Sequence, residues 1–159
     1  MLASHYQPAP HLPHLDATKL LPLLYQGSLP PSAEAVRLNG FDVLVFCAKE
    51  VQPPAHALQV RGLKVLRCGI DDNGHDLPTD DEKLVQRTAR EVEMRMSAGQ
   101  KILVTCAQGR NRSGLVNALV IHRAMRGTKS GADVVRYIQS RRPNALTNEA
   151  FVRAIRRLR

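Results

Sequence analysis

The strongest constraint on the fold is the stretch KILVTCAQGRNRSG, residues 101–114. Its apolar run, residues 102–104, is typical of a buried strand, and an apolar helical pattern begins at Leu115. The polar loop between them carries Cys106 at the end of the strand and Arg112 six residues later. A loop that curls back over so short a distance can direct a thiolate and a guanidinium at the same small anion. The stretch therefore predicts phosphate chemistry.

The loop contains backbone N–H groups that no regular strand or helix would use, and such groups can converge on an anion. They belong to Ala107, Gln108, Gly109, Arg110 and Asn111. The positive end of the following helix would add to them and favour the Cys106 thiolate, because cysteines at helix N-termini have a pKa of roughly 3.5 to 7.5. Arg112 can bind two phosphoryl oxygens through its planar fork, and Ser113 can donate to the sulfur. The alternative is an inert buried cysteine beside residues that merely turn the chain and cap a helix.

The motif C-x5-R-S-G after a strand resembles the signature of the protein tyrosine phosphatase superfamily, and residues 20–159 resemble its dual-specificity branch. The resemblance implies that Cys106 is the nucleophile, that Arg112 binds the phosphate and that Ser113 helps to break the phosphoenzyme. One residue departs from the family pattern, because Thr105 occupies the position of the usual His. That His helps to hold the loop and the thiolate, so Cys106 is expected to be less acidic than is usual. Asn148, after an Arg-Arg-Pro segment similar to that of the family, is expected to support the fold near the loop.

A general acid must protonate the leaving oxygen opposite the thiolate. The apolar strand predicted over residues 63–70 ends in the polar loop IDDNGHDLP, which can bring a carboxylic acid to the site. By resemblance to the family, Asp72 takes the general-acid position, with Asp71 as the alternative. Aspartates in such loops also serve simply as turn formers, and His75 is either a surface residue or a proton shuttle.

Cys47 lies near the end of another apolar strand, predicted over residues 41–48. In some relatives a cysteine of this strand forms a reversible disulfide with the nucleophile, so the resemblance makes Cys47 a candidate redox partner of Cys106. The competing interpretation is a small, inert core residue.

Composition limits the cellular setting and the partners. Three cysteines on apolar strands argue against a disulfide-rich secreted scaffold, and no stretch has the roughly 18 apolar residues of a membrane helix. A cytoplasmic protein without a transmembrane segment is therefore expected.

The basic residues are concentrated in the C-terminal part of the chain. Residues 101–159 contain 13 Lys or Arg residues and two acids, a net charge of +11. This charge would attract anionic substrates, and nucleic acid or anionic lipid are possible partners, with solvated surface arginines as the alternative. No metal is expected, because the spacing of the histidines in the first 14 residues suggests no ligand geometry. No cofactor is expected either.

The order of elements predicts an α/β domain with a mixed, mostly parallel sheet of about five strands flanked by helices, over residues 20–159. A flexible tail is expected over residues 1–19, followed by one extended edge segment from Leu20. Helices are predicted over residues 32–38, 79–99, 115–125 and 132–140 and from residue 147 or 148 to the C-terminal arginines. Thr79 and Glu82 have the spacing of a capping box.

The predicted activity is that of a phosphomonoesterase acting through a phosphocysteine, on phosphotyrosine and on phosphoserine or phosphothreonine in proteins, as is typical of the resembled branch. Arg110, an extra cation in the loop, suggests a phosphoinositide or an RNA 5′-triphosphate as alternative substrates. A non-catalytic phosphate-binding module is a third possibility. A rhodanese-like protein or a low-molecular-weight phosphatase fits less well, because neither explains an acid-bearing loop some 34 residues before Cys106.

Overall fold

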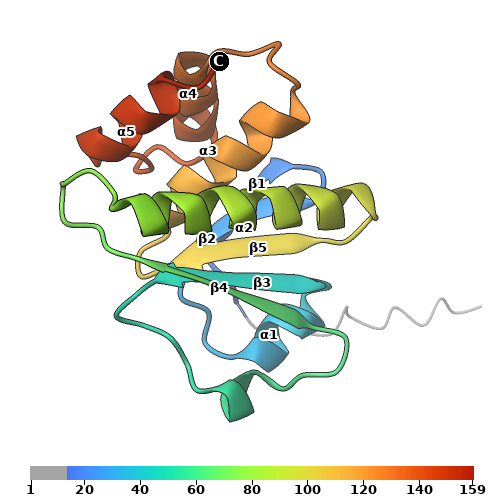
Figure 1. Ribbon diagram of the computed structural model, residues 1–159. Helices are drawn as coiled ribbons and strands as arrows, with labels where there is room; N and C mark the ends of the chain where they lie inside the picture. Colours follow the sequence, from blue (N-terminus) through green and yellow to red (C-terminus); the bar gives the residue numbers. More distant parts are fainter. Residues whose placement is uncertain (1–13) are drawn as a thin grey trace, which may run out of the picture.

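The computed structural model describes residues 14–159, which form one five-stranded sheet with helices on both faces (Figure 1). The strands are β1 (Ala17–Leu21), β2 (Leu24–Ser28), β3 (Val43–Ala48), β4 (Lys64–Ile70) and β5 (Ile102–Cys106). Their order across the sheet is β1-β2-β5-β3-β4, and every neighbouring pair is parallel except β1 and β2. The predicted mixed, mostly parallel α/β fold is confirmed.

The central strands β3 and β5 are buried along their whole length. Their sequences, VLVFCA and ILVTC, are nearly continuous apolar runs, as expected for strands that are covered on both faces. They pair in parallel with Val45 opposite Val104, so both strands end at the same edge of the sheet. In an open α/β sheet this carboxyl edge is where ligands bind.

The first two strands form a hairpin, which the sequence analysis did not predict. The chain reverses between Leu21 and Leu24, where Pro22 removes a backbone donor, and β1 pairs antiparallel with β2. The single extended segment predicted from Leu20 is therefore wrong. β1 begins at Ala17, before the predicted start of the domain, and residues 1–13 of the predicted tail lie outside the described residues.

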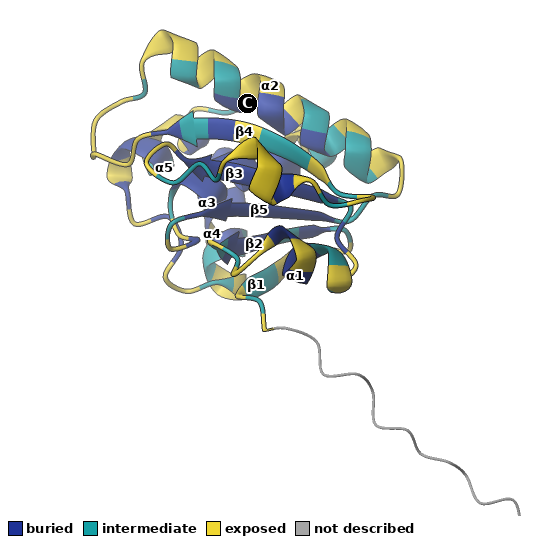
Figure 2. Cartoon of the chain, turned by 90° about the horizontal axis from the view of Figure 1, so that it is seen from below, coloured by how far each residue is buried: buried dark blue, intermediate teal, exposed yellow. Residues whose placement is uncertain are grey.

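Four helices cover one face of the sheet and a smaller set covers the other (Figures 1 and 2). The larger layer contains α2 (Thr79–Ser97), α3 (Arg112–Ala124), α4 (Gly131–Arg141) and α5 (Glu149–Arg156). The smaller layer contains α1 (Ala33–Leu38) and a 3₁₀ turn, η1 (Ala55–Leu58). Because side chains alternate along a strand, β3 and β5 contribute to both layers of the core.

The helix boundaries follow the predicted ones closely, with one correction. Thr79 is the first residue of α2 and Pro78 occupies the N-cap, so the predicted capping box does not form. Three acidic residues in the first turn of α2 instead complement the positive end of the helix dipole. A capping box does form at α4, between Ser130 and Asp133.

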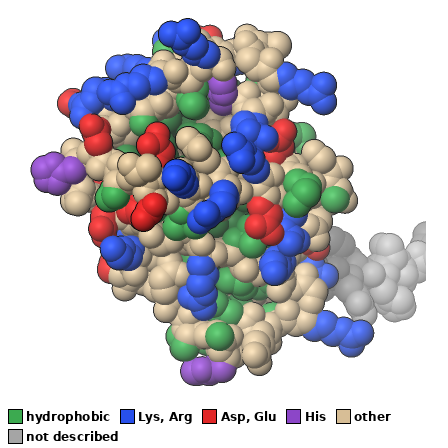
Figure 3. Space-filling view, viewed as in Figure 1, with side chains coloured by type: hydrophobic (Ala, Val, Ile, Leu, Met, Phe, Trp, Pro, Cys, Tyr) green, Lys and Arg blue, Asp and Glu red, His purple; other side chains and the backbone are tan. Residues whose placement is uncertain are grey.

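The surface seen in Figure 3 carries Lys and Arg side chains with Asp and Glu side chains between them. Ion pairs among the described residues include Arg123 with Glu93 and Arg95 with Glu91. No helix between residues 14 and 159 is long and apolar enough to cross a bilayer.

Candidate active site

The predicted phosphate loop connects β5 to α3 at the carboxyl edge of the sheet. Cys106 is the last residue of β5 and Arg112 is the first residue of α3, so the loop lies at the positive end of a 13-residue helix. Gly109 has a φ of 67°, and a Cβ atom there would lie 2.4 Å from the carbonyl carbon of Gly27. Only glycine fits this position, because the backbone is left-handed and the loop packs directly on β2.

The backbone N–H groups of the loop are free. Within the described part of the chain, none of the N–H groups of residues 107–111 donates a hydrogen bond. The carbonyl oxygens of Gln108, Gly109 and Arg110 all accept hydrogen bonds. Unpaired N–H groups beside paired carbonyls are the arrangement of an anion-binding nest.

Arg112 is held by a carboxylate that the sequence analysis overlooked. Its Nη1 and Nη2 atoms donate to the two oxygens of Glu50 over 2.5 and 2.6 Å, and Nη1 also donates to the Ile70 carbonyl over 3.1 Å. The hydrogen bond from Arg112 lowers the pKa of Glu50 to about 2, and Glu50 in turn raises the pKa of Arg112. A signal for Glu50 was present in the sequence, since it follows β3 by two residues at the carboxyl edge of the sheet.

The Nε atom of Arg112 is buried and has no hydrogen-bond partner among the described residues. Leaving a buried donor unpaired costs about 1–3 kcal/mol, and more for a charged group. An oxygen of a bound phosphoryl group would satisfy this donor. The guanidinium therefore has one side engaged by Glu50 and a further N–H available for an anion.

Cys106 and Ser113 are adjacent. The sulfur lies 3.2 Å from the Ser113 hydroxyl oxygen, and both residues are buried. Thr105 occupies the position of the family's His, but its hydroxyl donates to the Val45 carbonyl of β3 over 2.8 Å. Thr105 thus ties β5 to β3 directly below the loop.

Asp72 lies beside the loop and is fixed by two amides. Its Oδ2 atom accepts a hydrogen bond from Asn111 over 3.1 Å, and its Oδ1 atom accepts one from Asn148 over 2.6 Å. Asp71, the alternative acid, forms a 3.7 Å ion pair with Lys49 instead. The geometry thus brings Asp72, and not Asp71, into contact with the phosphate loop.

These residues surround a hollow of about 260 Å³ at the surface. It is lined by Glu50, Asp72, Cys106, Ala107, Gln108, Arg110, Asn111 and Arg112. The lining contains no aromatic side chain, and Arg110 is exposed at its edge. Among residues 14–159, no group of three or more His, Cys, Asp or Glu side chains is arranged to hold a metal ion.

Cys47 lies in the core together with a second thiol, that of Cys68. Contact with Cys68 and complete burial both raise the pKa of the Cys47 thiol. Cys106 is close enough to act on this pKa as well. Two thiols, and not one, are therefore candidates for pairing with Cys47.

A scan of protein-family models and a search of curated proteins found no match to this sequence. Solved structures do match. Human DUSP28 is 25% identical, with a TM-score of 0.69 over 91% of this chain and 95% of its own. The active form of Tk-PTP is 21% identical, with a TM-score of 0.74 over 90% of this chain and 98% of its own.

The chain has the fold of the dual-specificity phosphatases of the protein tyrosine phosphatase superfamily. The resemblance noted in the sequence is thereby confirmed. A further match is the human tyrosine phosphatase-like serine/threonine/tyrosine-interacting protein, which is 18% identical with a TM-score of 0.72 over 89% of this chain and 94% of its own. The phosphatase-like fold places the site described above at the edge of the sheet where β5 ends.

Proposed function

We propose that this phosphatase-like chain is a cysteine-dependent phosphomonoesterase that acts through a phosphocysteine intermediate. The observation that best supports the proposal is the unpaired, buried Nε–H of Arg112 beside free loop amides, in a hollow that Cys106 and Asp72 also line. Donors fixed in advance around a tetrahedral anion stabilise the charge of a transition state most effectively, because they need not reorganise during the reaction.

In the first step, the Cys106 thiolate attacks phosphorus in line with the leaving oxygen. The S–P bond forms as the P–O bond breaks, and Asp72 transfers its proton to the departing oxygen. Arg112 and the loop amides hold the three equatorial oxygens as the group becomes trigonal.

In the second step, water attacks the phosphocysteine and Asp72 accepts a proton from it. The S–P bond breaks, and the sulfur departs as a thiolate stabilised by the Ser113 hydroxyl, which lies 3.2 Å away. Phosphate is released and Cys106 is regenerated. No metal or cofactor takes part in either step.

The amides of Asn111 and Asn148 give Asp72 the hydrogen-bond pattern of a carboxylate, because both of its oxygens accept. This is the form that the second step needs. In the first step the acid donates a proton, so one of these amides must release its oxygen when substrate binds. The first step needs Cys106 deprotonated and Asp72 protonated, so the pH–rate profile is expected to be bell-shaped.

The proposed substrates are phosphotyrosine and phosphoserine or phosphothreonine in proteins. A hollow of about 260 Å³ without aromatic walls offers no clamp for one particular side chain, which supports activity on both short and long phosphorylated side chains. The proposed location is the reducing cytoplasm, where a catalytic thiolate persists. The basic residues of positions 101–159 are proposed to attract anionic substrates and, as further partners, nucleic acid or anionic lipid.

Arg110 supports polyanionic substrates as a second candidate class. Its side chain is exposed at the edge of the hollow, and within residues 14–159 it makes no hydrogen bond or ion pair. A free cation at this place can bind a second phosphate of a phosphoinositide or an RNA 5′-triphosphate. Wild type and Arg110→Ala should be compared on phosphopeptides, inositol lipids and triphosphorylated RNA. Equal losses on all three would remove Arg110 as a determinant of specificity.

The proposed mechanism is tested with an aryl phosphate and two substitutions. Cys106→Ser should abolish turnover and retain anion binding, and Asp72→Ala should slow turnover by about 10²–10⁴-fold. Turnover by Cys106→Ser would refute the mechanism. A wild-type protein that binds phosphate without hydrolysing any ester would instead be the non-catalytic binding module.

A further inference from the structure

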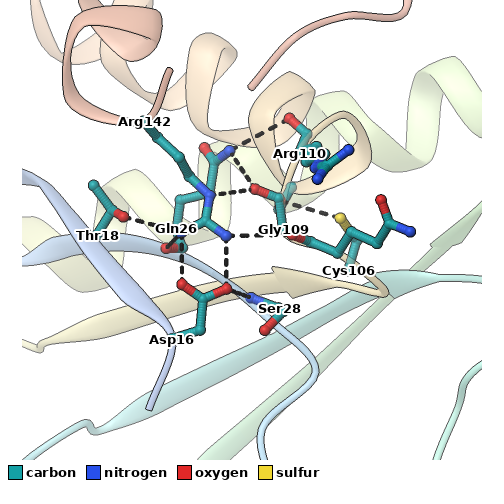
Figure 4. Close-up of polar contacts among 10 residues, drawn as sticks. Asp16, Thr18, Gln26, Ser28, Cys106, Gly109, Arg110 and Arg142 are labelled. Atoms are coloured by element: carbon teal, nitrogen blue, oxygen red, sulfur yellow. Dashed lines mark hydrogen bonds and ion pairs between the residues drawn. The ribbon is translucent and has the colours of Figure 1, made fainter. Parts of the chain in front are cut away.

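Arg142, which directly follows α4, reaches the outer side of the phosphate loop (Figure 4). Its Nε atom donates to the Gly109 carbonyl over 2.6 Å, and its Nη2 atom donates to the Gln108 carbonyl over 3.2 Å. The side chain is only 13% exposed. An arginine distant in sequence from the loop thus engages two consecutive loop carbonyls from outside the anion site.

Gln26, on β2, lies next to Arg142 and also contacts the loop carbonyls (Figure 4). Its Nε2 atom donates to the Gly109 carbonyl over 3.0 Å and to the Arg110 carbonyl over 3.4 Å (Figure 4). Gln26 is fully buried, and its Oε1 atom accepts from Asn117 over 3.3 Å. Because Asn117 engages the oxygen, the amide nitrogen is the atom that faces the loop.

Arg142 is itself held rigidly. Its Nη1 and Nη2 atoms donate to the two oxygens of Asp16 over 2.9 and 2.7 Å, and Nη1 also donates to Thr18 over 3.0 Å. The hydrogen bond from Arg142 lowers the pKa of Asp16 to about 2, so the ion pair is intact throughout the neutral range. The position of the guanidinium is therefore determined by β1 and the residue just before it.

The orientation of the loop amides follows from the planarity of the peptide bond. In a trans peptide the C=O of one residue points opposite to the N–H of the next. A Gln108 carbonyl held outward therefore turns the Gly109 N–H inward, and the same holds for the next two peptides. Three outward carbonyls fix the inward N–H groups of Gly109, Arg110 and Asn111, which are among those that donate to no other described residue.

We propose that Arg142 and Gln26 are positioning residues that, together with the Leu146 N–H that donates to the Arg110 carbonyl over 3.1 Å, hold three peptide planes of the loop so that their N–H groups converge on the substrate phosphoryl group. This inference rests on the proposed function, because it identifies what prepares that site for a tetrahedral dianion. Neither side chain touches the substrate. Both act through the loop backbone.

The test measures binding of tungstate, a tetrahedral dianion, by calorimetry to wild type, Arg142→Met and Gln26→Met. Methionine keeps the length of both side chains and removes their donors. Each variant should bind tungstate about tenfold more weakly, because a loop N–H that is no longer held toward the anion is lost as a preorganised donor, and such a loss costs that much or more. The KM for an aryl phosphate should rise and kcat should fall.

Tyr137→Phe is the matched control. The Tyr137 hydroxyl donates to the Leu20 carbonyl and so joins α4 to β1, as the Arg142–Asp16 pair does, without touching the loop. This variant should bind tungstate within about twofold of wild type. If Arg142 only stabilised the fold, Arg142→Met would have a lower free energy of unfolding, and the protein that remained folded would bind tungstate as tightly as wild type.

Wild-type tungstate affinity in the folded Arg142→Met and Gln26→Met proteins would overturn the inference. If Arg142→Met does not fold, the tungstate affinity of Gln26→Met alone tests the inference. Gln26 is uncharged and takes part in no ion pair, so its substitution removes no charge pair from the fold. Tungstate binding can be measured without turnover, so the proposed activity and the proposed positioning role are tested by separate measurements. A wild type that binds tungstate and hydrolyses no ester refutes the proposed function, whereas active enzyme with unchanged tungstate affinity in both variants refutes only the positioning role.

Discussion

The pairing of Glu50 with Arg112 leads to the most informative substitution, Glu50→Gln. Gln keeps the shape of Glu but replaces one oxygen with an NH₂ group, which would face a guanidinium N–H over the 2.5 or 2.6 Å that now separates the partners. Two donors cannot share that distance, so Arg112 must rotate or withdraw. Its Nε–H would then leave the position in which it can bind a phosphoryl oxygen.

The magnitude follows from the pKa of Glu50, which the Arg112 hydrogen bond lowers from 4.5 to about 2. At about 1.4 kcal/mol for each pKa unit, this depression corresponds to roughly 3 kcal/mol without screening. The Glu50 side chain is 55% exposed, and solvent screening reduces this interaction by about half. About 1.4 kcal/mol remains, so kcat/KM for an aryl phosphate should fall about tenfold.

Asp71→Asn is the control for this experiment. It removes the same charge from the neighbouring loop, where Asp71 pairs with Lys49, but it breaks no contact with Arg112. The two variants should be compared by steady-state kinetics at neutral pH and by tungstate affinity. If Glu50→Gln loses no more activity than Asp71→Asn, or gains activity, Glu50 does not orient Arg112. A large loss in Asp71→Asn would instead return Asp71 as a candidate acid.

Three other outcomes are expected. Gly109→Ala should weaken tungstate binding by at least tenfold, because a Cβ there meets the β2 backbone at 2.4 Å; unchanged binding would show that the loop can shift freely. The Asp16 ion pair, with its pKa lowered from 3.8 to about 2, should stabilise the fold by about 1 kcal/mol after screening, fully above pH 3.8 and progressively less as pH falls toward 2. Urea unfolding of wild type and Asp16→Asn measures this, and a difference independent of pH would contradict it. Mild peroxide should join Cys47 to Cys106, and mass spectrometry that finds Cys47 joined only to Cys68, or to neither, would remove Cys47 as the redox partner.

Much of the architecture could be read from local patterns. The apolar runs that became β3 and β5 predicted buried strands, and Ser32 and Asn148 mark helix starts that the structure contains, each accepting from the first turn. The turn within residues 20–24 was missed, because an apolar sequence interrupted by Pro22 is compatible with one bent strand or with two. The capping box at Thr79 was wrong because the preceding proline already occupies the N-cap.

The sequence by itself determined the chemistry of the loop, because Cys106 and Arg112 are joined by a short covalent path that keeps them together in any compact arrangement. It could not determine what holds them. Glu50 is 62 residues from Arg112, and Asp16 is 126 residues from Arg142, so these partners meet only where the sheet brings the ends of its parallel strands and the start of antiparallel β1 to one edge. Hydrogen bonds of that kind depend on orientation to within a fraction of an ångström, and only the packed tertiary structure sets distances that finely.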